Sequence, residues 1–192
     1  MKISVILPTY NRSNILDLTI RNILNQSYLE FELIIINDAS KDNTLNIIKK
    51  YLSKDTRIKL INNYKNLGCA KSREVGLAAA SSEYIVFIDD DDFWHENKLL
   101  KQINSINVNN ADISICDYYI ESLNHKTYKS MRAFAENFKK QILNNPGPFF
   151  QTIMIKKSLF EQINEPFDTK SIPSEDWNFF IELSKVNPKF TY

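Results

Sequence analysis

Ile85-Val86-Phe87-Ile88-Asp89-Asp90-Asp91-Asp92-Phe93-Trp94 joins a short apolar run to four consecutive carboxylates. An apolar run of this length is typical of a buried strand that ends at the rim of a sheet. Carboxylates about 4 Å apart repel one another by about 1 kcal/mol in water, and a bound cation would offset that cost. Mg²⁺, Mn²⁺ and Ca²⁺ favour such oxygen ligands. The alternative is that one Asp caps the next helix and the others are solvated.

The spacing of apolar residues predicts strands and helices that alternate through the first ~120 residues. The strands are expected at 3–7, 31–36, 58–61 and 84–88, and the helices at 13–24, 45–52, 70–80 and 99–106. This alternation predicts an α/β fold, with a mostly parallel central sheet and helices on both faces. Pro8 is expected to end the first strand, because proline cannot continue a central ladder.

The regularity weakens in the last third of the chain. Residues 112–120 are predicted to form a strand with Tyr119 available for burial, and a helix after Ser174 is expected to bury Trp177. A chain of 192 residues is expected to form one domain. Its last residues, 188–192, suggest the start of another strand, so we expect a domain truncated at the C-terminus.

Composition narrows the functional classes. The formal net charge of +1 predicts no nucleic-acid partner. No apolar run approaches the ~20 residues that span a bilayer, so we expect a cytoplasmic protein, with peripheral association at the inner face of a membrane left open. The three glycines, Gly68, Gly76 and Gly147, form neither a dinucleotide-binding G-x-G-x-x-G nor a P-loop.

Polar residues follow three of the predicted strands, at 9–11, 37–38 and 89–92. Ligands of open parallel sheets bind beyond the carboxyl ends of the strands, so these segments are expected to share one rim. A metal held by Asp91 and Asp89 would leave coordination positions that phosphate oxygens usually fill. The simplest substrate therefore carries a diphosphate. Tyr10 could stack on a base and Asp38 could accept from one, although an edge-covering aromatic and a turn residue explain them equally well.

Five motifs resemble those of glycosyltransferase family 2, the inverting nucleotide-sugar transferases of GT-A (Rossmann-like) fold. They are Ser4-Val5-Ile6-Leu7-Pro8-Thr9-Tyr10-Asn11-Arg12, Ile36-Asn37-Asp38-Ala39-Ser40, Asn66-Leu67-Gly68, Phe87-Ile88-Asp89-Asp90-Asp91-Asp92 and Glu175-Asp176. Their order and separations are similar to the family's across essentially the whole chain.

The resemblance implies a role for each matching position. The nucleotide-sugar would be held by Pro8, Thr9, Tyr10, Asn11, Asp38, Lys71, Arg73, Asp89 and Asp90. Asp91 and Asp89, the outer acids of a D-x-D motif, would hold Mn²⁺ or Mg²⁺. Asp176 would be the general base that deprotonates the acceptor hydroxyl, with Glu175 as the second candidate.

Two departures from the family pattern stand out. The second motif often reads Asp-Asp-Gly-Ser, whereas Asn37 and Ala39 replace its first and third residues here. The loss of glycine indicates a turn that does not need a positive φ at position 39. Arg73 is followed by Glu74 where the family often has asparagine, which adds a negative charge near the expected phosphates.

The sequence thus predicts a metal-dependent glycosyltransferase that uses a UDP-sugar donor and a glycan or lipid-linked acceptor, in polysaccharide or glycoconjugate synthesis. Residues 1–120 would form the nucleotide-sugar half of the domain and 121–192 the acceptor half. A sugar-phosphate nucleotidyltransferase is one alternative, although Pro8-Thr9-Tyr10-Asn11 lacks the glycine that its phosphate loop would need. A non-catalytic domain that binds nucleotide-sugar or glycan is the other.

Overall fold

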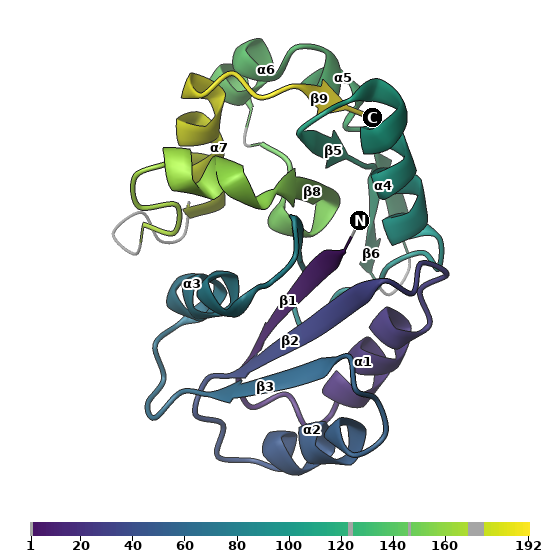
Figure 1. The fold of residues 1–192 in the computed structure, drawn as a ribbon, viewed down its shortest axis with the longest axis vertical. Helices are drawn as coiled ribbons and strands as arrows, with labels where there is room; N and C mark the ends of the chain where they lie inside the picture. The colour runs from purple at the N-terminus through teal and green to yellow at the C-terminus, as the bar shows by residue number, and fades with distance from the viewer. Residues whose placement is uncertain (1, 123–124, 146, 169–174) are drawn as a thin grey trace. The chain divides into compact units, whose positions relative to one another are not determined.

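A computed structural model describes residues 2–122, 125–145, 147–168 and 175–192 (Figure 1). The chain divides into two compact units, Met1–Leu100 and Lys101–Tyr192, each described here by itself. The elements that begin in the first unit are β1 (Ile3–Thr9), α1 (Leu16–Leu24), β2 (Phe31–Asn37), α2 (Thr44–Leu52), β3 (Ile58–Asn62), α3 (Cys69–Ala79), β4 (Tyr84–Phe87) and α4 (Lys98–Asn109).

The first unit is a parallel sheet in the order β3-β2-β1-β4, covered by helices on both faces. Right-handed crossovers explain the two layers. The chain moves from β1 to β2 to β3 in one direction, which puts α1 and α2 on one face. It then returns past β1 to β4, which puts α3 on the other face (Figure 1). The predicted α/β architecture is confirmed.

The close approach of α3 to the sheet depends on Gly76. A Cβ atom at this position would lie 2.4 Å from Cγ2 of Ile6 and 2.8 Å from Cδ1 of Ile36. Both isoleucines are fully buried strand residues. Glycine therefore lets the helix backbone pack directly on β1 and β2, beside the strand ends that carry polar residues.

Pro8 lies inside β1, where it pairs with Ile36, so the prediction that it ends the strand is wrong. The carbonyl of Ile6 accepts from the N–H of Ile88, so the even-numbered residues of β1 present their backbone groups toward β4. The N–H that Pro8 lacks would point the same way. Because β4 pairs with β1 only as far as Ile6, the missing donor costs the β1–β2 ladder nothing.

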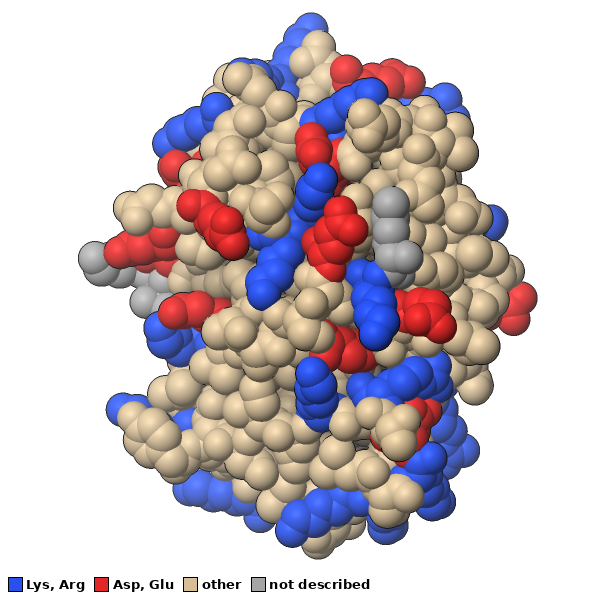
Figure 2. All heavy atoms as spheres, viewed as in Figure 1, with Lys and Arg blue, Asp and Glu red and all other residues tan. Residues whose placement is uncertain are grey.

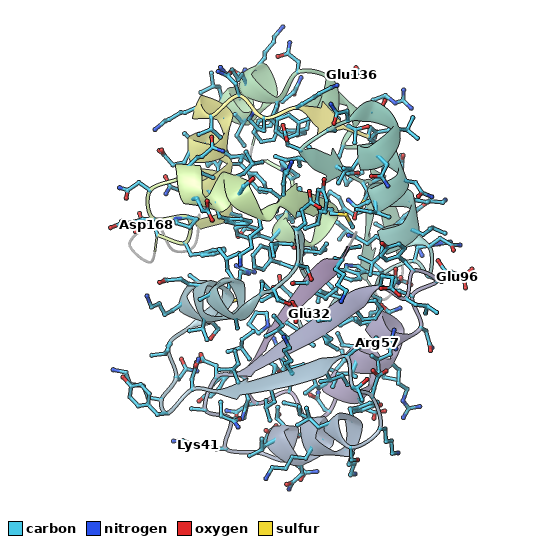
Figure 3. All side chains as sticks on the ribbon, in the orientation of Figure 1. Glu32, Lys41, Arg57, Glu96, Glu136 and Asp168 are labelled. Atoms are coloured by element: carbon cyan, nitrogen blue, oxygen red, sulfur yellow. The ribbon has the colours of Figure 1, made fainter. Side chains whose placement is uncertain are left out.

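Glu32 of β2, labelled in Figure 3, binds polar groups from β1, from β3 and from the segment before β4. Its Oε1 accepts from Oγ of Ser4 at 2.6 Å and from the N–H of Ser81 at 2.7 Å, and its Oε2 pairs with Nζ of Lys59 at 2.6 Å. Burial alone would raise the pKa of Glu32, but the bonds from Lys59, Ser4 and Ser81 outweigh it and lower the pKa from 4.5 to about 2.

This pKa predicts that the protein loses stability in mild acid. A carboxyl group with a lowered folded-state pKa stabilises the fold above its unfolded pKa of 4.5, and that contribution disappears as the pH falls toward about 2. The loss amounts to at most about 3 kcal/mol. Urea unfolding of wild type and Glu32→Gln across this range measures it. Equal losses in the two proteins would contradict the assignment to Glu32.

The second unit continues α4 and adds a mixed sheet and a separate hairpin. Its elements are β5 (Ile113–Ile115), β6 (Tyr118–Ser122), β7 (His125–Lys129), α5 (Arg132–Glu136), α6 (Phe138–Asn144), β8 (Ile153–Lys156), α7 (Glu175–Lys185) and β9 (Phe190–Thr191), with 3₁₀ turns at Phe150–Thr152 and Lys157–Gln162. β5 pairs with β8 antiparallel and with β9 parallel. Among the described residues, β6 and β7 form a separate two-stranded antiparallel sheet.

Two predictions for this unit are wrong. Residues 112–120 do not form one strand, because the chain leaves the sheet after β5 and Asp117 accepts from the N–H of Met131 at 2.8 Å. Tyr119 then lies on the hairpin and is 59% exposed. Trp177 is 37% exposed, while its neighbour Phe179 takes the buried place on α7. Ser174, the expected helix cap, lies outside the described residues.

None of the described helices is long and apolar enough to cross a membrane.

Candidate active site

A cavity of about 420 Å³ opens in the first unit where β1, β2 and β4 end and α3 begins. It is lined by Pro8, Thr9, Tyr10, Arg12, Asp38, Asn66, Gly68, Cys69, Ser72, Arg73, Asp89, Asp90 and Asp91. The three rim segments predicted to meet therefore do meet. The polar residues Thr9, Tyr10 and Asp38 share one concave surface with Asp89, Asp90 and Asp91.

Asp38 is buried beneath this cavity and holds one of its walls. Its Oδ1 accepts from Nδ2 of Asn63 at 2.7 Å and from the N–H of Leu67 at 2.9 Å, and its Oδ2 accepts from the N–H of Gly68 at 2.9 Å. Gly68 adopts a φ of +84° there, a conformation that glycine reaches without strain. The predicted nucleotide contact of Asp38 stays a prediction. Its observed role is to fix the loop that leads into α3.

The turn after Asp38 corrects one expectation. Ala39 adopts a φ of 61°, so the turn does require the left-handed conformation even though the glycine common in the family is missing. Such a conformation costs an L-residue roughly 1–2 kcal/mol. Backbone bonds on either side hold it in place, since the N–H of Asp38 donates to the carbonyl of Thr9 at 2.9 Å and that of Ala39 to the carbonyl of Asn37 at 2.9 Å.

The acids that follow β4 divide into buried and accessible groups. The Asp90 side chain is 10% exposed, and its oxygens accept from Oγ1 of Thr9 at 2.7 Å and from Nε of Arg12 at 3.0 Å. Burial raises the pKa of Asp90, while Thr9 and Arg12 act against that rise. Asp89 and Asp91 are 33% and 54% exposed on the cavity surface. Asp90 is therefore held by contacts within the protein, whereas its two neighbours are accessible from the cavity.

Arg73 brings a buried positive charge to the same surface from α3. Its side chain is 4% exposed, and its Nη2 donates to Oδ1 of Asp89 at 2.7 Å. Lys71, also predicted to bind the donor, directs its Nζ to Glu74 at 2.7 Å and does not belong to the cavity lining among the described residues. Lys71 thus compensates the extra negative charge of Glu74.

The loop after β1 presents one aromatic face and closes on the β2 loop. Tyr10 lines the cavity and is 41% exposed, which leaves its ring open to a flat ligand. Asn11 adopts a φ of 54°, donates its N–H to Oγ of Ser40 at 3.0 Å and accepts from the N–H of Lys41 at 2.8 Å. Asn11 therefore shapes the rim from outside the cavity lining. Arg12 was missing from the predicted site, although it stands next to Asn11 in the first motif.

The donor set suits a divalent cation that is completed by its substrate. Within the described parts of the chain, no three His, Cys, Asp or Glu side chains gather closely enough to hold a metal alone. Asp89 and Asp91 nevertheless bring two accessible carboxylates to one cavity, beside Arg73. Mg²⁺ and Mn²⁺ commonly bind one or two carboxylates and take their other ligands from substrate phosphates and water. The residues fit that mode of binding.

The predicted bases lie on α7 in the second unit. Oδ2 of Asp176 accepts from the backbone N–H of Phe150 at 3.4 Å, so its carboxylate is oriented toward the turn that precedes β8. The dipole of α7 stabilises a negative charge in its first turn. The ring of Phe149, next to that turn, is 42% exposed. Glu175 is the first residue of α7.

Acidic and basic side chains are interspersed over the face shown in Figure 2, in keeping with the totals of 23 Asp and Glu and 24 Lys and Arg. The candidate site reflects the same balance. Two arginines, Arg12 and Arg73, accompany the four acids of the cavity lining, Asp38, Asp89, Asp90 and Asp91. A ligand that combines negative phosphates with a divalent cation matches such a mixed surface.

Two relatives of assigned activity align along nearly the whole chain. Poly(ribitol-phosphate) beta-N-acetylglucosaminyltransferase TarP of Staphylococcus aureus is 37% identical over 189 residues, which cover 95% of this chain and 57% of TarP. The UDP-Glc:alpha-D-GlcNAc-diphosphoundecaprenol beta-1,3-glucosyltransferase WfgD of Escherichia coli is 31% identical over 185 residues, which cover 96% of this chain and 70% of WfgD.

Structural comparison agrees with these relatives. The crystal structure of S. aureus TarS in complex with UDP-GlcNAc matches with a TM-score of 0.76 at 26% identity, over 95% of this chain and 53% of the TarS chain. This chain therefore spans about half the length of the TarS chain, and its fold is the GT-A fold of such enzymes. The sequence model of glycosyl transferase family 2 matches residues 4–164. The chain belongs to glycosyl transferase family 2, as its motifs predicted.

Proposed function

We propose that this protein transfers a sugar from a UDP-sugar to an acceptor hydroxyl, with inversion, and that a divalent cation assists the departure of UDP. The observation that carries the proposal is the cavity at the strand ends, which Tyr10 and Arg73 line together with the accessible carboxylates of Asp89 and Asp91. A nucleoside diphosphate needs an aromatic surface, a positive charge and a cation site. Tyr10, Arg73 and the pair Asp89 and Asp91, which line one cavity, are our candidates for these three roles.

The donor and acceptor classes follow from the relatives. The TarS structure contains UDP-GlcNAc, and the WfgD name specifies a UDP-glucose donor and a diphosphoundecaprenol-linked acceptor. We infer a UDP-hexose donor and an acceptor that is a cell-envelope glycan or its lipid-linked precursor. Such an acceptor would place the reaction at the inner face of the membrane. The family match favours sugar transfer over the nucleotidyl transfer considered from the sequence.

The proposed reaction requires a base for the acceptor hydroxyl and positive charge for the leaving diphosphate. Asp176 accepts the proton of the acceptor hydroxyl, whose oxygen forms the new bond to the anomeric carbon. The bond from that carbon to the diphosphate breaks, and its electron pair leaves with UDP. Asp91 and Asp89 would hold a Mn²⁺ or Mg²⁺ ion, which when bound would stabilise the negative charge of the departing diphosphate. Arg73 adds a second positive charge there, and Tyr10 stacks against the base.

Asp91→Asn tests the cation assignment. We expect this variant to bind UDP with an affinity that Mn²⁺ no longer increases, and to lose roughly 10²–10³-fold in turnover, the typical effect of removing one stabiliser of transition-state charge. Isothermal titration of UDP with and without Mn²⁺, and a donor screen that measures UDP release, report the two effects.

Asp92→Asn is the matched control, since Asp92 is the neighbouring acid and does not belong to the described cavity lining. It should retain the Mn²⁺ dependence of UDP binding. Full metal-dependent activity in Asp91→Asn would remove Asp91 from the cation site. No binding of UDP to the wild-type protein in either buffer would refute the proposed donor.

A further inference from the structure

Arg12 connects the loop after β1 to the acidic cluster. Its Nε donates to Oδ1 of Asp90 at 3.0 Å, and its Nη2 donates to Oδ2 of Asp91 at 3.4 Å. All three side chains line the same cavity. A single guanidinium therefore bridges one buried carboxylate and one accessible carboxylate, and the accessible one is the proposed cation ligand.

The two halves of this bridge differ in strength. The Asp90 side chain is 10% exposed and also accepts from Thr9, so its bond to Nε is the anchor of the guanidinium. The Asp91 side chain is 54% exposed, and its bond to Nη2 is long. Exposed ion pairs of this kind contribute little and exchange readily with other partners. Arg12 can release Asp91 without leaving Asp90.

We propose that Arg12 is the resident counter-ion of the acidic cluster and makes cation binding depend on the nucleotide. With no donor present, the guanidinium neutralises Asp91 and opposes a cation at that carboxylate. When a diphosphate arrives, its negative charge accommodates the cation and the guanidinium together. This inference rests on the proposed function and adds a positioning residue to it, because Arg12 acts through Asp91.

The side chain of Arg12 can be replaced without dismantling the loop. Its backbone N–H donates to Oγ1 of Thr44 at 3.0 Å, and its carbonyl accepts from the N–H groups of Ile15 at 3.1 Å and Leu16 at 3.0 Å. These backbone bonds form with any residue at position 12. Arg12→Gln therefore keeps the backbone bonds at the start of α1 and removes the guanidinium, with its charge and its bonds to Asp90 and Asp91.

The decisive measurement is Mn²⁺ affinity in the absence of nucleotide, followed by the electron paramagnetic resonance signal of free Mn²⁺. We expect Arg12→Gln to bind Mn²⁺ roughly tenfold more tightly than wild type, because even in a water-like dielectric a neighbouring positive charge repels a dication by about that factor. The factor by which Mn²⁺ increases the affinity for UDP should shrink by a similar amount. Arg12→Lys, which retains the charge, should restore most of the wild-type behaviour.

Arg21→Gln is the matched control, because Arg21 is an exposed arginine of α1 that pairs with Asp17 on the same helix. It should behave as wild type. Unchanged Mn²⁺ affinity in Arg12→Gln overturns the proposal. So does a variant that loses UDP affinity without metal while its Mn²⁺ affinity is unchanged, since Arg12 would then be a direct phosphate ligand. Failure of UDP to bind any variant would refute the proposed function, whereas the nucleotide-free titration would still test Arg12.

Discussion

Replacing Asp176 by asparagine is expected to lower kcat by about 10²- to 10⁴-fold and to leave the affinity for UDP unchanged. Asparagine has nearly the same shape but cannot take up the proton of the acceptor hydroxyl. Its amide oxygen can still accept the N–H of Phe150, the bond that orients Asp176 in the native protein. Release of UDP in the presence of acceptor measures the loss, and isothermal titration of UDP measures donor binding.

Two further variants of α7 make this test specific. Glu182→Gln changes a partly exposed acid that pairs with Lys185 one turn from the end of the helix, and it should keep wild-type turnover. Glu175→Gln examines the second candidate base. If Asp176→Asn turns over at the wild-type rate while Glu175→Gln does not, the base is Glu175 and the role proposed for Asp176 is wrong.

Asp38→Asn is expected to destabilise the first unit by about 2–4 kcal/mol and to weaken UDP binding in parallel. Asparagine has one oxygen where the carboxylate uses two, so its amide nitrogen would face either the N–H of Gly68 or the donors from Asn63 and Leu67. An unsatisfied buried donor costs about 1–3 kcal/mol, and a lost bond to a charged group about 1.5–3. The wall of the cavity formed by the loop before α3 would then lose its support.

Thermal unfolding and UDP titration report the two effects of Asp38→Asn separately. A loss of about 3 kcal/mol should lower Tm by roughly 6–12 °C in a chain of this size. Asp55→Asn is the control, because Asp55 also organises a turn of the first unit, through Arg57, but lies outside the described cavity lining. A stable Asp38→Asn protein that binds UDP as wild type would show that the loop is held by other contacts.

The first unit could be predicted from sequence because its signals are local and repeat. Each strand is an apolar run, each helix has a periodic apolar face, and alternation of the two predicts a parallel sheet. The errors in this unit concern backbone details. Pro8 remains in β1 because its missing N–H points to a neighbour whose pairing has ended, and Ala39 accepts a positive φ that surrounding bonds enforce. Neither fact is visible without the tertiary pairing.

The second unit was harder to predict because its elements depend on distant partners. β5 is three residues long and pairs with β8 and β9, which lie about 40 and 75 residues further along the chain. Alternation alone could not distinguish it from the adjacent β6, which turns away into the hairpin. On α7, the choice between Trp177 and Phe179 was decided by aromatic packing around Phe150, to which Phe179 lies at a ring distance of 4.9 Å.

The candidate site shows what motif reasoning leaves out. Sequence motifs brought Tyr10, Asp38, Arg73 and the four consecutive acids to one rim, and the structure places Tyr10, Asp38, Arg73 and Asp89 to Asp91 around one cavity. The motifs could not reveal that the carboxylate of Asp90 accepts hydrogen bonds from Thr9 and Arg12 within the protein. The signal for Arg12 was present in the sequence, because Arg12 is the one basic residue of the first motif and another motif of the same rim carries four acids.

The polar contacts of Glu32 also determine how the strands of the first unit are aligned. β1 and β2 are continuous apolar runs buried on both faces, so a slip of one strand by a single residue would still bury apolar side chains. Ser4 and Glu32, which lie opposite each other, break that degeneracy, because a slip would send them to different faces of the sheet. A polar pair near one end of the strands thereby excludes misaligned sheets and ensures that Thr9 and Asn37 arrive together at the other end, beside the cavity.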